Sequence, residues 1–300
     1  MSSTISFIRR LLQLGRRWKY RHRPDMADQH ELFDFFEYAK DFKLQSGLRP
    51  LLITNDGIFV RTVAGFFVWF DPRCVHGILW GPEKSGVWEP GITKVCLERL
   101  KDGGTFLDVG ANVGMFSMTV ASHLENVEIH AFEPVPANFL VLSNNLTINN
   151  LEAKVISNNL AVGRSCGTIS MAIDGQLSHV SVTEAESNLQ TTGINLVSLD
   201  DYCKSNNLTD VKLIKCDVEG FELDVVLGGK ELIQSQKPSL ILEIEEKWTS
   251  RYNYTAKDIF DVLETLGYTG KPILQNGELG HLNVSIEQKL KQSNVFLFDF

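Results

Sequence analysis

The chain has 300 residues, of which 43% are hydrophobic and 22% are charged. That length can bury a real core, and this composition argues against disorder, collagen-like repeats and low-complexity assembly. No stretch reaches the roughly 18 apolar residues of a membrane span. The net charge of −8 is uneven, because residues 1–23 hold seven Arg and Lys residues and no acid. An acidic body with a basic tail argues against a general nucleic-acid binder.

The cysteines indicate a reducing compartment. They are odd in number, form no C-x-x-C pair and lack the spacing of a zinc cluster: Cys74, Cys96, Cys166, Cys203 and Cys216. Arginines interrupt the apolar start of the chain, which is unlike a secretory signal peptide. We therefore expect reduced thiols and a cytoplasmic protein.

Residues 1–24 have the pattern of a basic amphipathic helix. On a helical wheel, Arg9, Arg10, Arg16 and Arg17 fall opposite an apolar face. Such a helix can lie in an anionic membrane interface. Three interpretations stay open: peripheral contact with the inner membrane face through residues 1–23, packing on the chain's own domain, and a frayed terminus.

Residues 25–85 are predicted to form an extension made of one helix and a β-hairpin. The helix is expected over 27–43, and strands are expected within 51–71 around the turn Asn55-Asp56-Gly57. The aromatic cluster at 66–70 is expected to belong to the core of this extension. A loop at 81–91 with Gly and Pro residues then separates it from a region with a different pattern.

Residues 86–300 alternate between strand and helix patterns. Strands are predicted at 105–109, 127–132, 153–157, 211–216, 239–244 and 294–300, and helices at 113–124, 136–148, 221–235 and 256–266. Residues 168–198 interrupt this rhythm with short strands and a polar loop at 183–193, after which Ser198 caps a short helix. The alternation predicts an α/β fold with a mostly parallel, doubly wound sheet. Ligands of such sheets bind at the carboxyl ends of the strands.

Two loops at strand ends have the chemistry of a nucleoside-type ligand site. The turn Asp108–Gly114 has the pattern G-x-N-x-G after an acid, which permits close approach of the backbone to a ligand. Glu133 follows the next strand, where a carboxylate can accept hydrogen bonds from both ribose hydroxyls. The alternative for Glu133 is a solvated acid before a proline turn.

A third loop, Lys215–Glu222, and a fourth, Glu243–Glu246, are rich in carboxylates. These acids can deprotonate a substrate hydroxyl or hold a divalent ion. For Lys215 and Glu222, structural salt bridging is an equally good interpretation. Because the two strands should be neighbours, we expect Asp217 and Glu243 to face the same crevice.

Taken together, these motifs identify a family. Phe106–Gly114, Ala131–Pro134, Ser198–Asp201 and Ile214–Glu222 resemble, in order and spacing, the FkbM-type S-adenosylmethionine-dependent methyltransferases. The resemblance runs from about residue 86 to the C-terminus and includes Trp88-Glu89-Pro90 and the last strand. The first 85 residues lie outside it, and Cys216 replaces a residue that is more often apolar.

The resemblance implies a Rossmann-like class I methyltransferase fold, with seven strands of which the last is antiparallel. It also implies S-adenosyl-L-methionine as cofactor and O-methylation of a hydroxyl on a glycan or other small-molecule acceptor. The implied donor contacts are Asp108, Gly110, Asn112 and Gly114 for the methionine part, Glu133 for the ribose, Asn158 and Asn159 for the adenine, and Glu89 for the amino group.

The catalytic base is left open between two candidates. Asp217 is the first, with Glu219 and Glu243 positioning the acceptor or a cation, and His179 in the irregular 168–193 segment is the second. If Mg²⁺ is required, Asp217 and Glu243 are its expected ligands. His179 as an ordinary loop histidine is a further interpretation.

Two functions from other classes are alternatives to methyl transfer. A nicotinamide- or flavin-linked oxidoreductase is disfavoured by Asn112, which stands where the dinucleotide fingerprint has its second glycine. A non-catalytic module that binds the methyl donor is disfavoured because Asp108, Glu133, Asp217 and Glu219 are all present. The sequence does not predict an oligomeric state.

Overall fold

A computed structural model describes residues 49–54, 57–62, 64–69, 88–174, 177–180, 191–281 and 283–300. These residues fall in two compact units, one up to Val87 and one from Trp88 onward. The predicted basic segment at 1–24, the helix at 27–43 and most of the polar loop at 183–193 lie outside the described residues.

The first unit contains a three-stranded antiparallel sheet. Its strands, in order, are β1 (Arg49–Thr54), β2 (Gly57–Arg61) and β3 (Phe67–Trp69). Thr54 pairs with Gly57, so the hairpin closes at the turn that the sequence predicts. Within the aromatic cluster, Phe66 is buried, as are Phe59 and Val68.

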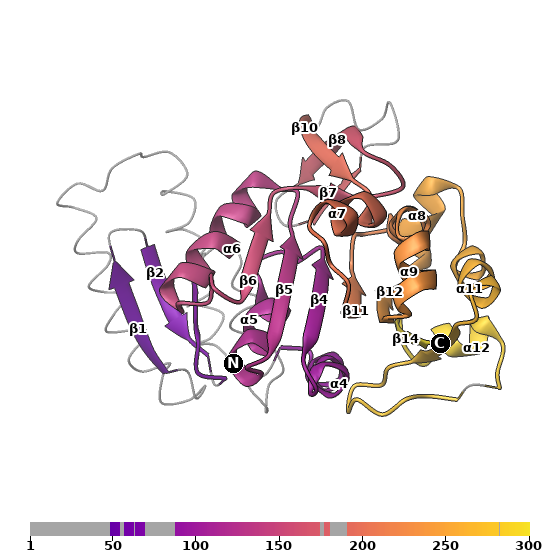
Figure 1. The fold of residues 1–300 in the computed structure, drawn as a ribbon, viewed down its shortest axis with the longest axis horizontal. Helices are drawn as coiled ribbons and strands as arrows, with labels where there is room; N and C mark the ends of the chain where they lie inside the picture. The colour runs from indigo at the N-terminus through magenta and orange to yellow at the C-terminus, as the bar shows by residue number, and fades with distance from the viewer. Residues whose placement is uncertain are drawn as a thin grey trace, which may run out of the picture. The chain divides into compact units, whose positions relative to one another are not determined.

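The second unit is built on a seven-stranded sheet (Figure 1). Its strands are β4 (Gly104–Val109), β5 (Val127–Phe132), β6 (Val155–Asn158), β11 (Val211–Cys216), β12 (Ser239–Glu243), β13 (Thr269–Pro272) and β14 (Val295–Asp299). The spatial order is β13-β14-β12-β11-β4-β5-β6, and only β14 runs antiparallel to both of its neighbours. This confirms the predicted class I sheet, whose last strand is antiparallel.

Helices follow the strands and cover the sheet. They are α4 (Pro90–Leu100), α5 (Met115–His123), α6 (Pro136–Ile148), α7 (Leu199–Ser205), α8 (Glu222–Gly228), α9 (Lys230–Gln236), α10 (Glu246–Thr249), the 3₁₀ turn η2 (Ser250–Tyr252), α11 (Ala256–Thr265) and α12 (Ile286–Leu290). The main core joins β11, β12 and β14 to α7, α8, α9 and α11. Cys216 is fully buried in this core as a free thiol. The thiol therefore packs where the family more often has an apolar side chain.

Local sequence signals explain several of the helix ends. The Ser198 hydroxyl accepts a hydrogen bond from the Asp201 amide, and Thr255 and Asp258 form a reciprocal capping box. The helix predicted over 221–235 is instead two helices that meet at Gly229. Gly228 lies so close to Gly163 that a Cβ would stand 2.0 Å from the Gly163 carbonyl oxygen. The break between α8 and α9 therefore coincides with a close contact to a segment that is distant in the sequence, and local helix propensity does not explain it.

A four-stranded second sheet occupies the region where the alternation fails. Its order is β7 (Ala161–Val162), β10 (Thr191–Val197), β8 (Gly167–Asp174) and β9 (Leu177–Val180). Figure 1 shows β7, β8 and β10 beyond the carboxyl ends of β4, β5 and β6. This sheet therefore stands beside the edge of the main sheet where ligands of such folds bind.

Candidate functional site

A pocket opens at the carboxyl ends of β4, β5 and β11. Its lining comes from the turn after β4 (Val109, Gly110, Asn112), the end of β5 and its helix (Phe132–Val135, Asn138), the second sheet (Leu160–Val162, Ile169) and the loop after β11 (Asp217–Glu219, Phe221). Of the twelve residues proposed from the sequence as site residues, Gly110, Asn112, Glu133, Asp217 and Glu219 therefore share one cavity.

The turn after β4 contributes two residues with unusual backbone conformations to this pocket. Gly110 and Asn112 both have positive φ, at 78° and 51°. A Cβ at Gly110 would stand 1.9 Å from the carbonyl oxygen of Asp217, so only glycine fits there. Gly114, also at positive φ, precedes α5 and packs on Leu142 rather than lining the pocket.

Glu133 is a buried carboxylate with both oxygens held by backbone amides. Oε2 accepts from the Asn112 amide and Oε1 from the Val135 amide, each at 2.9 Å. Burial raises the pKa of Glu133 to about 7, although the two amides act in the opposite direction. Oε1 also accepts a long hydrogen bond, at 3.4 Å, from the side-chain amide of Asn138. Oε2 therefore keeps a lone pair for a ligand hydroxyl, and a second hydroxyl at Oε1 would displace the weak Asn138 contact.

Asp108 lies behind the pocket rather than on its surface. It is fully buried, and its Oδ2 accepts a 2.6 Å hydrogen bond from the Ser117 hydroxyl. Its other oxygen, Oδ1, is buried without a hydrogen-bond partner among the described residues. Burial raises its pKa and the nearby Lys215 ammonium lowers it. Such an orphaned acceptor fits a bound ligand that carries a donor group.

Lys215 is a further functional candidate, for which the sequence favours structural salt bridging and a functional role equally. Its ammonium is buried, 3.3 Å from Asp217 Oδ2 and 4.8 Å from the centroid of the Phe116 ring. Burial lowers its pKa, but the carboxylates of Asp217, Asp108, Glu89 and Glu243 together raise it above its ordinary value. The sequence signal for this site is a lysine at the end of a strand, followed within the next seven residues by three carboxylates.

Glu89 and Glu243 approach this ammonium from two other elements. Glu89 precedes α4 with φ 39°, and burial raises its pKa while Lys215 lowers it. Glu243 ends β12, where its Oε1 accepts a 2.8 Å hydrogen bond from Asn294. Burial, then repulsion from Asp217, raises the pKa of Glu243 to about 8. Both acids thus belong to the charge environment of Lys215, outside the pocket lining.

The loop after β11 places Glu219 in the pocket in a strained backbone conformation. Its φ is 54°, and its Oε2 is buried with no hydrogen-bond partner in the described part of the chain. Burial, then Asp217, raises its pKa to about 7. Glu222, by contrast, anchors the loop, because Oε1 accepts from the amides of Val218 and Gly220 and Oε2 from the Tyr254 hydroxyl.

Asn159 holds the segment that carries Glu133. Its side-chain amide donates to the carbonyl oxygens of Glu133 at 2.8 Å and of Pro134 at 3.0 Å. Asn159 does not line the pocket itself. Its two hydrogen bonds instead fix the wall on which the ribose is expected to bind.

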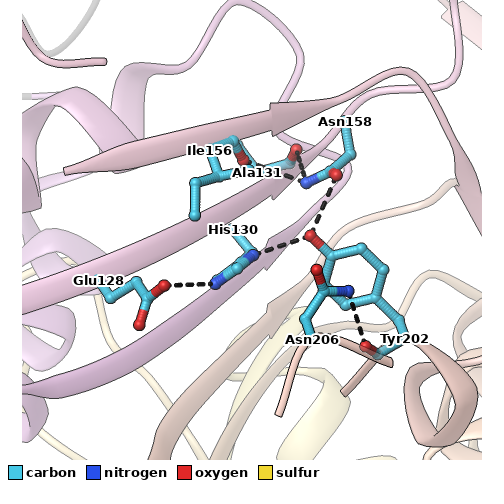
Figure 2. A network of polar contacts seen from close by, with 7 residues as sticks. All are labelled: Glu128, His130, Ala131, Ile156, Asn158, Tyr202 and Asn206. Atoms are coloured by element: carbon cyan, nitrogen blue, oxygen red, sulfur yellow. Dashed lines mark hydrogen bonds and ion pairs between the residues drawn. The ribbon is translucent and has the colours of Figure 1, made fainter. Parts of the chain in front are cut away.

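Asn158 belongs to a chain of polar contacts that joins β5, β6 and α7. Figure 2 shows Glu128, His130, Tyr202 and Asn158 in line. The Tyr202 hydroxyl donates to Asn158 Oδ1 at 3.0 Å and lies 2.8 Å from His130 Nδ1, while His130 Nε2 lies 3.3 Å from Glu128. The Asn158 amide group donates to two main-chain carbonyls, which fixes its orientation. The side chain of Asn158 is thus already engaged within the protein.

The remaining sequence candidates concern a second base and a metal. His179 lies in β9 opposite Ala172, and its side chain is outside the described residues. Across the described ranges, no three His, Cys, Asp or Glu side chains are arranged to hold a metal ion. A Mg²⁺ bound by Asp217 and Glu243 therefore stays a prediction. No described helix has the length and apolar character needed to cross a bilayer.

Comparison with known proteins gives related sequences from a fungus and an archaeon. The chain is 28% identical over 147 residues to Methyltransferase 1 of Beauveria bassiana, covering 42% of this chain and 59% of that protein, which is less than two thirds of its length. It is 27% identical over 179 residues to the hexuronic acid methyltransferase AglP of Haloferax volcanii, covering 59% of this chain and 70% of that protein.

A solved structure and a family model also match the chain. A methyltransferase FkbM from Methylobacillus flagellatus aligns with 66% of this chain and 44% of that chain, at 16% identity and a TM-score of 0.42. The model of the methyltransferase FkbM domain matches residues 108–269, which begin at Asp108 and include the turn after β4, Glu133 and the whole loop after β11. Since this match spans more than half of the chain, the protein belongs to the FkbM methyltransferase family.

Proposed function

We propose that the protein transfers a methyl group from S-adenosyl-L-methionine to a hydroxyl group of a sugar, a glycan or a related small molecule. The observation that carries this proposal is Glu133, a buried carboxylate at the end of β5 that lines the pocket and has each oxygen aligned by a backbone amide. Two adjacent acceptors in one carboxylate suit the two hydroxyls of a ribose.

The rest of the pocket offers contacts for the other parts of the donor. The glycine turn at Gly110 permits close approach of the backbone, and Oδ1 of Asp108 behind it has no partner among the described residues. The lining also includes an apolar part, with Val135 and residues 160–162, which suits an adenine ring. Asn159 holds the main chain at Glu133 and Pro134, and the Asn158 carbonyl accepts from the Glu133 amide.

The methyl donor supplies the reactive sulfonium, so the chain itself mainly has to align the acceptor oxygen and take its proton. Asp217 is the proposed base, because it lines the pocket and is held by the Lys215 ammonium. Glu219 is the second carboxylate on the same wall, and a pKa near 7 suits proton transfer at neutral pH. His179 and a Mg²⁺ at Asp217 and Glu243 are the further proposals for this step.

Calorimetric titration with S-adenosylmethionine and, in parallel, with NAD⁺ tests the donor. We expect micromolar binding of S-adenosylmethionine that Glu133→Ala weakens at least tenfold, or about 1.4 kcal/mol. Glu152→Ala, at an exposed glutamate, is the matched control and should bind normally. Absence of donor binding, or a preference for NAD⁺, would contradict the proposal and favour the oxidoreductase alternative.

A turnover assay separates an enzyme from a binding module. S-adenosylhomocysteine that binds tightly, with no methyl transfer to any of a broad panel of sugars, would favour the module. A sugar panel is the first choice because a related protein is named for hexuronic acid.

A second proposal concerns location. We propose a cytoplasmic protein that contacts the inner membrane face through residues 1–23, which carry seven basic residues and no acid. Deletion of these residues should abolish co-sedimentation with liposomes that contain anionic lipids. Unchanged co-sedimentation would contradict this proposal without affecting the donor titration.

A further inference from the structure

The segment 246–252, which comprises α10 and η2, packs directly on the loop that carries Glu219. A Cβ at Gly220 would stand 2.7 Å from the carbonyl carbon of Trp248, so the two backbones are in close contact. The ring of Tyr252 lies edge-on to the ring of Phe221, with 5.6 Å between centroids. Because Phe221 lines the pocket, segment 246–252 borders the pocket on the side of the proposed base.

This segment presents two exposed cations next to one indole ring. The Lys247 ammonium lies 5.0 Å, and the Arg251 guanidinium carbon 4.5 Å, from the centroid of Trp248. Contacts of this kind attract a cation and restrict its orientation. Both cations also act electrostatically on Glu219, whose pKa they lower against the effect of burial. They are therefore positioned near a carboxylate that lies inside the pocket.

The charge of these residues contrasts with the rest of the site. Asp217, Glu219 and Glu245 all stand on the loops around them, and the chain beyond residue 23 has a net charge of −15, since +7 of the total −8 belongs to residues 1–23. An acidic rim repels an anionic acceptor. A neutral sugar needs no cation at this position, whereas an anionic sugar needs one to overcome that repulsion.

We propose that segment 246–252 and Glu219 form an acceptor subsite for an anionic sugar residue. Lys247 and Arg251 pair with the carboxylate or phosphate of the sugar, and Glu219 accepts a hydrogen bond from a ring hydroxyl. The planar guanidinium of Arg251 suits two-point pairing with either anion. This proposal rests on the proposed methyltransferase function and names its substrate class.

The competing interpretation is that Lys247 and Arg251 belong only to surface ion pairs. Lys247 is paired with Glu245, and exposed ion pairs of this kind contribute little to stability or binding. Under that interpretation the two cations would not distinguish an anionic sugar from a neutral one. The two interpretations therefore differ in a quantity that can be measured.

The test uses the full chain and three small probes: methyl β-D-glucuronide, glucose 6-phosphate and methyl β-D-glucoside. Each is titrated by calorimetry with saturating S-adenosylhomocysteine and again without it. We expect at least one anionic probe to bind tenfold more tightly than the neutral glucoside. Comparison of the two anionic probes then distinguishes a carboxylate from a phosphate.

Variants of Lys247 and Arg251 test whether segment 246–252 causes the preference for an anionic sugar. Arg251→Gln and Lys247→Gln should each weaken the anionic probe about three- to tenfold and leave the glucoside unchanged, and the double variant should remove the preference. Lys257→Gln, at an exposed lysine of α11 paired with Asp261, is the matched control. Equal binding of all probes, binding of none, or a preference that survives the double substitution would overturn the subsite.

Failure of the broader function is distinguishable from failure of the subsite. If S-adenosylhomocysteine does not bind the unmodified chain, the methyltransferase proposal fails, while the sugar titrations without it still report on segment 246–252. If S-adenosylhomocysteine binds all variants equally and the probes are not distinguished, only the subsite fails.

Discussion

The Lys215 ammonium lies 3.3 Å from Oδ2 of Asp217, and this contact joins a buried cation to a carboxylate that opens to the pocket. Lys215 is almost completely buried, whereas 36% of the Asp217 side chain is exposed. The same ammonium acts on the buried carboxylate of Asp108 behind the turn after β4. One positive charge therefore links the proposed donor side of the site to the proposed base.

Removal of this charge should destabilise the protein strongly. Lys215→Met leaves Asp108 and Asp217 without their cation, and loss of one partner of a buried ion pair costs about 3–5 kcal/mol. The free energy of unfolding, measured by urea denaturation, should fall by this amount. Lys257→Met, at an exposed lysine, should change it by less than about 0.5 kcal/mol.

A second substitution tests which carboxylate depends on Lys215. If the buried Asp108 carboxylate causes most of the loss, Asp108→Asn combined with Lys215→Met should be more stable than Lys215→Met alone. Equal or lower stability of the double variant would show that Lys215 acts mainly on Asp217 or on the acids of other elements.

Donor binding should depend on pH through Glu133. Its pKa of about 7 in the free protein means that ionisation, which strengthens hydrogen bonds from ribose hydroxyls, increases from pH 6 to pH 8. The affinity for S-adenosylhomocysteine should therefore rise about tenfold over this range, as the ionised fraction does. Glu133→Gln should bind weakly and without this pH dependence. An unchanged pH dependence in that variant would assign the titration to another group.

The stability of the folded protein should fall as the pH rises from about 5 to 8. The pKa values of Glu133, Glu219 and Glu222 are raised to about 7 and that of Glu243 to about 8, from an ordinary value of 4.5. The folded state thus holds these protons more tightly than the unfolded state, so the stabilisation is complete below 4.5 and lost as the pH passes the folded pKa values.

Thermal unfolding across this range measures that loss. The melting temperature should be higher at pH 6 than at pH 8, and Glu222→Gln, which removes a buried carboxylate outside the donor pocket, should reduce the difference. The lowered pKa of His130 opposes this trend only below its ordinary value of 6.5. A melting temperature that rises from pH 6 to pH 8 would contradict the buried-acid interpretation.

The central sheet was predictable because its signals are local. Apolar runs such as Val127–Phe132 and capping residues such as Ser198 mark strands and helix starts without reference to the rest of the chain. The elements that were missed depend on distant contacts. Helix α4 and strand β13 have no strong local pattern, and the break at Gly229 follows from the approach of Gly228 to Gly163.

The residues of the candidate site also divide into those with local sequence signals and those that depend on distant contacts. Gly110 and Glu133 could be selected from the sequence, because their chemistry follows from a position after a strand. For Lys215 the sequence offers a local signal, a lysine at a strand end before three carboxylates, but this signal does not distinguish a functional role from structural salt bridging. The distinction depends on Asp108 and Glu89, which act on Lys215 from more than a hundred residues away in the sequence. The contact between segment 246–252 and the Glu219 loop could likewise not be predicted from the sequence, because only the fold brings the two segments together.

The contacts of Asn158 assign the protons in the chain of Figure 2. The Asn158 amide donates to the carbonyls of Ala131 at 3.3 Å and Ile156 at 3.1 Å, so its oxygen faces Tyr202. The Tyr202 hydroxyl must then donate to Asn158, and His130 Nδ1 must donate to the Tyr202 oxygen. Neutral His130 should therefore carry its proton on Nδ1, and only the imidazolium form, which is protonated on Nε2 as well, can donate to the Glu128 carboxylate.

Removal of the Tyr202 hydroxyl should disturb both stability and donor binding. Tyr202→Phe leaves Asn158 Oδ1 and His130 Nδ1 without their partner, and an unsatisfied buried polar group costs about 1–3 kcal/mol. Because Asn158 and Asn159 support the pocket wall, the affinity for S-adenosylhomocysteine should also fall, whereas the pKa of Glu219 should not change. Asn206, whose exposed side chain donates to the Tyr202 carbonyl and not to the Tyr202 hydroxyl, offers Asn206→Ala as a control for donor binding.

Nitrogen-15 NMR of labelled histidine provides the most direct test of this assignment. Burial lowers the pKa of His130 and the Glu128 carboxylate raises it, so we expect a neutral ring with Nδ1 protonated at pH 7.5. Glu128→Gln should lower the pKa of His130 further, because it removes the charge that favours the imidazolium. A ring protonated on Nε2 at pH 7.5 would mean that Tyr202 donates to His130 instead, and that Asn158 is held by its own main-chain contacts alone.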